Sequence, residues 1–382
     1  MDSTYVSLLR RQTLAWTCST SPRSDSSLLP KMPANGEHHK NTILITGLNG
    51  YLAGRTAELI LRAGYRVRGT VRNQQAGEKV KAALLQLGYC SDDIDVLEIP
   101  DICRHGSLDS AATGCIAIFH LASPLAEIWT LPPSEVVRIA TESTARVLSA
   151  AARTGETMNS VVLVSSAAAL FDIPLESRHY TEKDWNTTSE QILKREGDDA
   201  GGLNAYLASK TAAERAFWKF RDTYAPSFGM TALQPTYFIG PPLIPWESAA
   251  SIPYSNSHFW KVVAGEEIPG PMMIYGDTVD IRDVARMLLW SALHPSQSDG
   301  QRFVCSSSVG GGQAIADILS RRMPTLKIQR GQPGQGYSPD YKPQVGVGGF
   351  DSNKAVSATG EDWIPYDESV VDMARFLQRY LP

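Results

Sequence analysis

The stretch NTILITGLNGYLAGRTAELI, residues 41–60, joins an apolar, β-branched run to a helical pattern through a glycine-rich turn. Gly47 lets the chain turn sharply out of a strand, and Gly50 lets the backbone approach a ligand closely. Ala53 with Gly54 lets the following helix lie close to a sheet, and the amides at the start of that helix face an anion. Tight turns also use glycine for purely structural reasons, so the position of this turn in the chain decides its meaning.

The chain alternates between strand and helix from this turn onward. Strands are expected at 42–46, 65–72, 94–100, 115–122 and 160–168, with helices at 50–63, 78–88, 134–153, 204–220 and 279–293. This alternation predicts an α/β fold, a Rossmann-type doubly wound parallel sheet covered by helices on both faces. The glycine-rich turn follows the first strand, which is where the pyrophosphate of a dinucleotide binds in that fold.

Composition sets the limits of this interpretation. The chain has 382 residues, is 43% hydrophobic and carries a net charge of −4, so it can bury a sizeable core and has no general attraction for nucleic acid or an anionic membrane. It contains no apolar stretch near the ~20 residues that a membrane span needs. The five cysteines are scattered without the spacing of a metal site, which favours reduced thiols in the cytoplasm and predicts no metal.

The first forty residues differ from the rest of the chain. They are rich in Ser, Arg and Pro and show no sustained period, so 1–40 is predicted to be a disordered leader. Its arginines and serines resemble a mitochondrial transit peptide, whereas Asp2, Asp25 and Glu37 argue against one. Met32 is an alternative start of the working chain. A cytoplasmic protein is the expectation.

The end of the second strand selects the cofactor. Sites for NAD usually place a carboxylate there, which holds the ribose 2′-hydroxyl. This sequence has Arg72 instead and no carboxylate between Arg66 and Ala76. An arginine at that point pairs with a 2′-phosphate, and Lys79 or Lys81 can add a second positive charge, so NADPH is favoured over NADH. The alternative is a solvated arginine at a strand end.

A Tyr-x-x-x-Lys pair lies on an alanine-rich helical segment, NAYLASKTAAERAFWKF at 204–220. Tyr206 and Lys210 are four residues apart and therefore project from one face of the helix. A neighbouring ammonium favours the phenolate and lowers the pKa of a tyrosine. The strand before this helix ends in Ser165 and Ser166, hydroxyls at the edge of the sheet where sites of this fold form, although serines also occur in ordinary turns.

Taken together, the motifs resemble those of an extended short-chain dehydrogenase/reductase. They are TGLNGYLAG, GTVRN, IPDIC, HLASP, VVLVSSAAALFD, NAYLASK, LQPTYFIGPP and VDIRDVA, and in that order they cover about residues 42–375. Within this superfamily the chain is most similar to the dihydroflavonol reductase-like group. The fungal NADPH-dependent ketone and aldehyde reductases resemble it most, through FDIP after the serines and KDWN before Tyr206. The tryptophan, tyrosine and cysteine typical of cinnamoyl-CoA reductases in that loop are missing, which argues against a CoA thioester substrate.

The resemblance implies a role for each matching residue. Tyr206 is the general acid, Lys210 lowers its pKa and binds the nicotinamide ribose, and one serine of the pair Ser165 and Ser166 polarises the carbonyl, with Ser166 favoured. The remaining implied cofactor contacts follow the order of the chain: Gly47, Asn49, Gly50, Tyr51, Leu52 and Ala53 at the pyrophosphate, Arg72 and Lys79 at the 2′-phosphate, Asp101 and Ile102 at the adenine, His120, Leu121, Ala122 and Ser123 at the ribose, Pro235, Thr236 and Tyr237 at the nicotinamide, and Ser257.

The chain is therefore expected to contain an NADP-binding domain at 41–235, with 276–301 packing back on it, and a smaller substrate-binding region at 236–275 and 302–382. Three features of the second region remain open. Asp280, Arg282 and Asp283 form either an electrostatic clamp or, the favoured alternative, a structural network. Trp246, Tyr254, Phe259 and Trp260 line a pocket or fill a core, and 331–349 is expected to be a flexible loop.

The resulting hypothesis is an NADPH-dependent reductase of a small, largely apolar ketone or aldehyde, which acts in secondary metabolism as a monomer or weak homo-oligomer. The alternatives on the same fold are a hydroxysteroid dehydrogenase, a sugar-nucleotide epimerase or dehydratase, and a non-catalytic NADP-sensing protein. Arg72 counts against the epimerase, which retains NAD, and an intact Tyr206 and Lys210 pair counts against the sensor.

Overall fold

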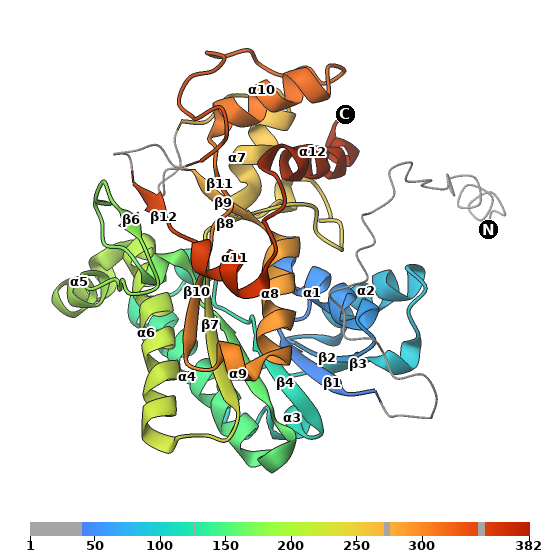
Figure 1. Cartoon of the computed structure of the whole chain (residues 1–382), viewed down its shortest axis with the longest axis vertical. Helices are drawn as coiled ribbons and strands as arrows, with labels where there is room; N and C mark the ends of the chain where they lie inside the picture. The colour runs from blue at the N-terminus through green and yellow to red at the C-terminus, as the bar shows by residue number, and fades with distance from the viewer. Residues whose placement is uncertain (1–39, 126, 271–275, 343–347) are drawn as a thin grey trace. The chain divides into compact units, whose positions relative to one another are not determined.

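Seven parallel strands form the central sheet, in the order β10-β7-β5-β4-β1-β2-β3 (Figure 1). They are β1 (Thr42–Thr46), β2 (Arg66–Val71), β3 (Ile94–Glu98), β4 (Cys115–His120), β5 (Ser160–Val164), β7 (Gly229–Pro235) and β10 (Gln301–Cys305). The strand order reverses between β1 and β4, and ligands of this fold bind at the carboxyl ends of the strands beside such a point. The predicted Rossmann-type α/β fold is confirmed.

The structure is a computed structural model that describes residues 40–125, 127–270, 276–342 and 348–382. The predicted leader therefore lies outside the described residues except for Lys40. The same holds for residues 343–347 of the loop expected at 331–349. The described residues on either side of that gap form a loop up to 342 and then β12 (Gly349–Phe350).

Both faces of the sheet are buried, and the side chains of β1 show how. Ile43 and Ile45 lie in one hydrophobic core and Leu44 in the other, because successive side chains of a strand point to opposite faces. The first core is shared with α1 (Tyr51–Arg62), α2 (Gln74–Gln86) and α8 (Ile281–Leu293). The second is shared with α3 (Asp109–Ala112), α4 (Pro133–Arg153) and α6 (Gly201–Tyr224). Burial on both faces explains the continuous apolar runs in the sequence.

Several element boundaries differ from the prediction, each for a local reason. The strand expected at 160–168 ends at Val164, because Ser166 accepts a hydrogen bond from Ala168 N and caps the short helix η4 (Ala167–Ala169). The helix expected from residue 78 begins at Gln74, capped by Asn73. The helix expected at 279–293 begins at Ile281, because the preceding residues form β9 (Asp277–Asp280).

A second, three-stranded sheet has the order β11-β9-β8, with β8 at Tyr237–Ile239 and β11 at Ser308–Val309. A third hydrophobic core gathers α7 (Tyr254–Val263), α10 (Gly312–Arg322) and α12 (Tyr366–Leu377) beside this sheet (Figure 1). The remaining elements are β6 (His179–Tyr180), which pairs with β12, and the helices α5 (Ser189–Glu196), α9 (Pro295–Ser298) and α11 (Asn353–Thr359). Because β10 belongs to the large sheet, that sheet extends past the predicted boundary at residue 301. The division into cofactor and substrate regions stays a prediction.

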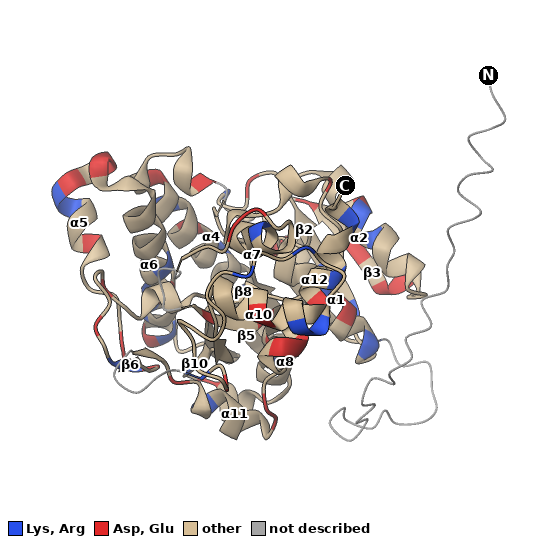
Figure 2. Ribbon diagram, turned by 90° about the horizontal axis from the view of Figure 1, so that it is seen from above, with Lys and Arg blue, Asp and Glu red and all other residues tan. Residues whose placement is uncertain are grey.

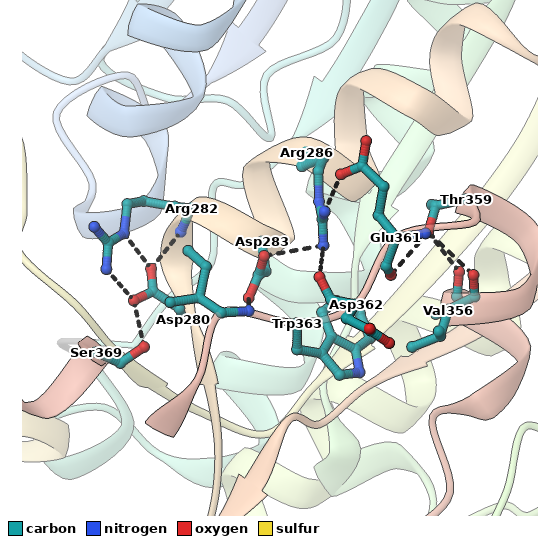
Figure 3. A network of polar contacts seen from close by, with 12 residues as sticks. Asp280, Arg282, Asp283, Arg286, Val356, Thr359, Glu361, Asp362, Trp363 and Ser369 are labelled. Carbon is teal, nitrogen blue, oxygen red and sulfur yellow. Dashed lines mark hydrogen bonds and ion pairs between the residues drawn. The ribbon is translucent and has the colours of Figure 1, made fainter. Parts of the chain in front are cut away.

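A polar network joins α8 to the C-terminal segment (Figure 3). Asp280 accepts hydrogen bonds from the Arg282 side chain and, at 2.7 Å, from the hydroxyl of Ser369. Asp283 accepts from the backbone amide of Ile364 at 2.8 Å. Asp280 and Asp283 are buried, with every one of these bonds directed to α8, α12 or the chain before α12. The contacts support the structural alternative for this acidic and basic cluster.

The charged residues of both signs are mixed along the chain. Figure 2 shows acidic and basic positions together on α5 and on α12. In the part of the chain that the structure describes, no helix is long and apolar enough to cross a membrane.

Candidate active site

The side chains of Ser166 and Tyr206 meet beyond the carboxyl end of β5. Their hydroxyl oxygens are 3.1 Å apart, with Ser166 just after the strand and Tyr206 in the second turn of α6. The amide of Ala168 donates to Ser166 Oγ at 3.1 Å and fixes the orientation of the serine. Lys210, one turn further along α6, is buried and donates from Nζ to Val164 O at 3.4 Å. The three predicted catalytic side chains therefore lie at one edge of the sheet.

Ser165 points away from this group into a buried polar network. Its hydroxyl donates to the Glu214 carboxylate on α6. Glu214 is fully buried and also accepts from Gln234 Nε2 at 2.7 Å and from Arg302 Nε at 2.6 Å. Ser165 thus helps to join three strands of the sheet to α6, whereas Ser166 is the serine that contacts Tyr206.

The pKa values of the two α6 residues are shifted mainly by burial. Desolvation raises the pKa of Tyr206, and the hydrogen bond from Ser166 opposes it only in part. Burial lowers the pKa of Lys210 to about 8, against the attraction of Glu214. The pKa of Tyr206 is thus raised overall, whereas the sequence predicted a lowering by Lys210, whose Nζ contacts Val164 O; the role assigned to Lys210 stays a prediction. A phenol held protonated at neutral pH is nevertheless what a proton donor requires.

His120 and Thr46 lie behind this group, at the ends of β4 and β1. Thr46 Oγ1 accepts from the amides of Leu121 and Ala122, each at 3.1 Å, so its own proton goes to His120 Nδ1, 2.9 Å away. Burial, together with the nearby charge of Lys210, lowers the pKa of His120 to about 3. His120 is therefore neutral, with its remaining proton on Nε2.

The glycine-rich turn has the conformation that the sequence predicts. Gly47 has a φ of +72°, and a Cβ there would lie only 3.2 Å from Ala122 Cα. The amide of Gly50 donates to Gly47 O at 2.9 Å and closes the turn into α1, which has no acidic residue in its first turn. Gly54 does not face the sheet as expected, because a Cβ there would meet Leu243 Cβ at 3.0 Å. The close approach made by Gly54 is therefore to the segment after β8.

A cavity of about 400 Å³ opens beside this turn. Its lining includes Asn49 and Gly50 from the turn, Lys79 from α2, and Leu243 and Trp246 from the segment after β8. Helix N-termini and glycine amides together with a lysine suit a phosphorylated ligand.

Arg72 and Lys79, which the sequence predicts at the 2′-phosphate, each form an ion pair with a glutamate. Arg72 pairs through Nη1 with Glu127, which follows β4. Lys79 pairs through Nζ with Glu247 at 2.6 Å, across the cavity.

The other residues predicted around the pyrophosphate and adenine lie at this edge of the sheet with varied roles. Tyr51 donates its hydroxyl to Gly240 O, so its side chain joins α1 to the segment after β8. Leu52 points into the core and can offer only backbone. Asp101 is exposed and accepts from Cys103 N at 2.8 Å, while Ile102 packs against the second core.

The residues predicted on the nicotinamide side follow β4 and β7. Leu121, Ala122 and Ser123 are half-buried directly after β4. Pro235 ends β7, and the amide of Thr236 donates to Cys305 O at 3.0 Å. Ser257 lies on α7, where its hydroxyl donates to Tyr254 O of the same helix at 2.7 Å.

Aromatic side chains surround the region next to Tyr206. Tyr237 follows β7, and burial together with the neighbouring Tyr206 raises its pKa to about 12. Tyr237 and Phe259 line a small cavity of about 30 Å³. The exposed rings of Trp129 and Tyr254 meet edge to face at 6.3 Å. Trp260 packs against the third core, and Trp246 packs against that core and also lines the larger cavity.

Sequence reasoning missed three residues of this site. Glu214 follows Tyr206 and Lys210 at the same four-residue spacing on α6, and that periodicity was a usable signal. Thr46 is the polar residue that ends β1 just before the glycine turn. Glu127 lies in a loop with no distinguishing pattern, so only the three-dimensional contact reveals it.

Comparison with protein families gives one match over most of the chain. The model of the NAD dependent epimerase/dehydratase family matches residues 43–306, which includes the glycine turn, both serines and the Tyr206 and Lys210 pair.

Individual relatives include proteins named as reductases. Tetraketide alpha-pyrone reductase 1 of Arabidopsis thaliana is 31% identical over 298 residues, which are 76% of this chain and 84% of the relative. The NADPH-dependent methylglyoxal reductase of Saccharomyces cerevisiae is 28% identical over 311 residues, 77% of this chain and 87% of the relative. The crystal structure of yeast methylglyoxal/isovaleraldehyde reductase complexed with NADPH superimposes with a TM-score of 0.75 at 24% identity, over 89% of this chain and 98% of that one.

Proposed function

The chain belongs to the NAD dependent epimerase/dehydratase family, and from that membership and the geometry of its site we propose that it is an NADPH-dependent reductase. Its substrate is a small, largely apolar ketone or aldehyde. The observation that carries the proposal is the 3.1 Å contact between Ser166 and Tyr206 at the carboxyl edge of the sheet. The reductases among its relatives support it.

The residues beside the crevice fit a phosphorylated dinucleotide. The tight approach of Gly47 to Ala122 leaves no room for a side chain where the backbone would face the pyrophosphate, and the cavity beside it offers Lys79. Arg72 stands at the strand end where a 2′-phosphate is recognised. When bound, NADPH would supply the hydride that adds to the carbonyl carbon.

Tyr206 and Ser166 act on the carbonyl oxygen. Ser166 orients that oxygen by hydrogen bonding, and Tyr206 donates its phenolic proton as negative charge develops there, giving the alcohol. Such a positioned acid contributes about 10²–10⁴ in rate. Lys210 places a positive charge one helical turn from Tyr206, and this charge stabilises the phenolate that remains until a proton returns from solvent.

The surroundings of Tyr206 favour an apolar substrate. Tyr237 lies close enough to Tyr206 and Tyr254 for both to raise its pKa, and Tyr254 forms an exposed edge-to-face pair with Trp129, so these rings offer apolar surface near the candidate acid. Aromatic walls with a few placed hydroxyls are typical of sites for small organic molecules.

The test is a panel of aldehydes and ketones with purified protein, monitored by loss of NADPH absorbance and repeated with NADH. The proposal predicts net oxidation of NADPH by at least one apolar carbonyl compound. An epimerase returns the hydride to its own cofactor and shows no net consumption, whereas a cofactor sensor binds NADPH tightly and turns over nothing.

A further inference from the structure

The ion pair between Arg72 and Glu127 spans the carboxyl end of β1, next to the cavity described above. Arg72 follows β2 and Glu127 lies in the loop after β4, while the sheet order at this place is β4-β1-β2. A contact from the end of β2 to the loop after β4 must therefore span the carboxyl end of β1. That end is where Gly47 and Gly50 turn into α1, beside the cavity assigned above to the dinucleotide.

The two partners of this pair differ in how firmly they are held. The Glu127 side chain is 19% exposed, whereas that of Arg72 is 65% exposed. Glu127 opens the short helix η2 (Glu127–Trp129), and the Trp129 ring lies against Gly202 in the first turn of α6, where no Cβ could be added. Glu127 is thus the more enclosed partner, and the exposed arginine is the partner with more freedom to move.

We propose that Glu127 competes with the 2′-phosphate of the cofactor for Arg72, and so sets how strongly the protein prefers NADPH over NADH; this inference rests on the proposed function. Carboxylate and phosphate oxygens both use the same fork of guanidinium donors. The guanidinium donors that bind Glu127 cannot bind the phosphate until this ion pair opens. NADH carries no 2′-phosphate and has nothing to gain from that exchange.

The pair between Lys79 and Glu247 provides a comparison within the same crevice. Its side chains are 52% and 77% exposed, so both ends are largely solvated. Ion pairs of that kind contribute little because water and salt screen them. Removing the Glu247 charge is therefore expected to change NADPH affinity less than removing the Glu127 charge.

The experiment measures dissociation constants for NADPH and NADH by calorimetric titration of the wild type and of Glu127→Gln. The variant is expected to bind NADPH about three- to tenfold more tightly, with NADH affinity unchanged within about twofold. Glu247→Gln changes NADPH affinity less than about twofold. Glu135→Gln is the matched control, since Glu135 pairs with Arg138 on the exposed face of α4.

A second variant separates competition from simple repulsion of the phosphate. In an Arg72→Ala background, Glu127→Gln should leave NADPH affinity unchanged, because the contested partner is gone. Unchanged or weaker NADPH binding by the single variant overturns the proposal, as does a gain that persists without Arg72. Wild-type protein that binds no NADPH at all would instead contradict the proposed function. Circular dichroism checks that each variant is folded.

Discussion

The hydroxyl oxygens of Ser166 and Tyr206 lie 3.1 Å apart, although the residues are 40 positions apart in the chain. β5 delivers the serine to the edge of the sheet and α6 returns along the sheet to deliver the tyrosine. Ser165, the immediate neighbour of Ser166, contacts Glu214 instead. The hydroxyl of Ser166 thus lies beside the candidate acid, whereas the hydroxyl of the adjacent Ser165 belongs to a buried polar network.

Replacing Tyr206 with Phe removes the proposed proton donor and keeps the ring. The rate of NADPH-dependent reduction is expected to fall by about 10²–10⁴, because the developing alkoxide loses its acid. NADPH affinity, measured by titration, should stay close to that of the wild type. Retained turnover in this variant would refute the assignment of the acid.

The two adjacent serines are expected to respond differently to alanine. Ser166→Ala removes the hydroxyl next to Tyr206 and should lower kcat by about 10-fold or more at nearly unchanged thermal stability. Ser165→Ala leaves Glu214 with one buried partner fewer and should lower stability by about 1–3 kcal/mol, with a smaller effect on kcat. Steady-state kinetics and thermal melts of both variants check this. The reverse pattern would assign catalysis to Ser165.

Arg72→Ala is expected to weaken NADPH binding by about 1.5–3 kcal/mol and to leave NADH binding nearly unchanged, because only the 2′-phosphate needs the guanidinium. Parallel titrations with both nucleotides measure the change in preference. Lys81→Ala is a control on α2, the helix that follows Arg72, since Lys81 does not line the cavity. Equal losses for the two nucleotides would count against a phosphate contact.

His120 should make the fold sensitive to acid. Its pKa is lowered to about 3 in the folded protein from the ordinary value of 6.5, so between these values the unfolded chain binds a proton that the folded protein does not. The free energy of unfolding therefore falls as pH falls through this window, by up to about 1.4 kcal/mol per pH unit.

His120→Asn removes this contribution and keeps a polar partner for Thr46. Denaturant unfolding of both proteins between pH 3 and pH 8 should show the wild type losing stability faster than the variant below about pH 6.5. Parallel stability curves over that range would show that His120 is not held neutral.

Much of the fold and the core of the site could be predicted from local patterns. The strand at 42–46 and the glycines after it predicted the parallel sheet and the turn beside the cavity, because the apolar pattern of a strand and the conformation of glycine are local properties. Tyr206 and Lys210 were found through helical spacing. The boundaries at Val164 and Gln74 were missed because caps by Ser166 and Asn73 override the apolar pattern.

The charges of the site could not be predicted in the same way. The pKa of Tyr206 depends mainly on burial that only the packed α6 creates, and this burial raises it. The pairing of Arg72 with Glu127 depends on the order β4-β1-β2, which brings together segments 55 residues apart. Ion pairs between segments far apart in the sequence depend on the strand order, which no short motif specifies.

The most direct test of the proposed reaction is transfer of deuterium from NADPH deuterated at both positions of the nicotinamide C4 to a carbonyl compound that the panel identifies. The account predicts an alcohol labelled at the carbinol carbon with the wild type and almost none with Tyr206→Phe, while both proteins bind NADPH. Equal labelling by the two proteins, or NADPH binding by the wild type without any labelled product across the panel, would contradict it.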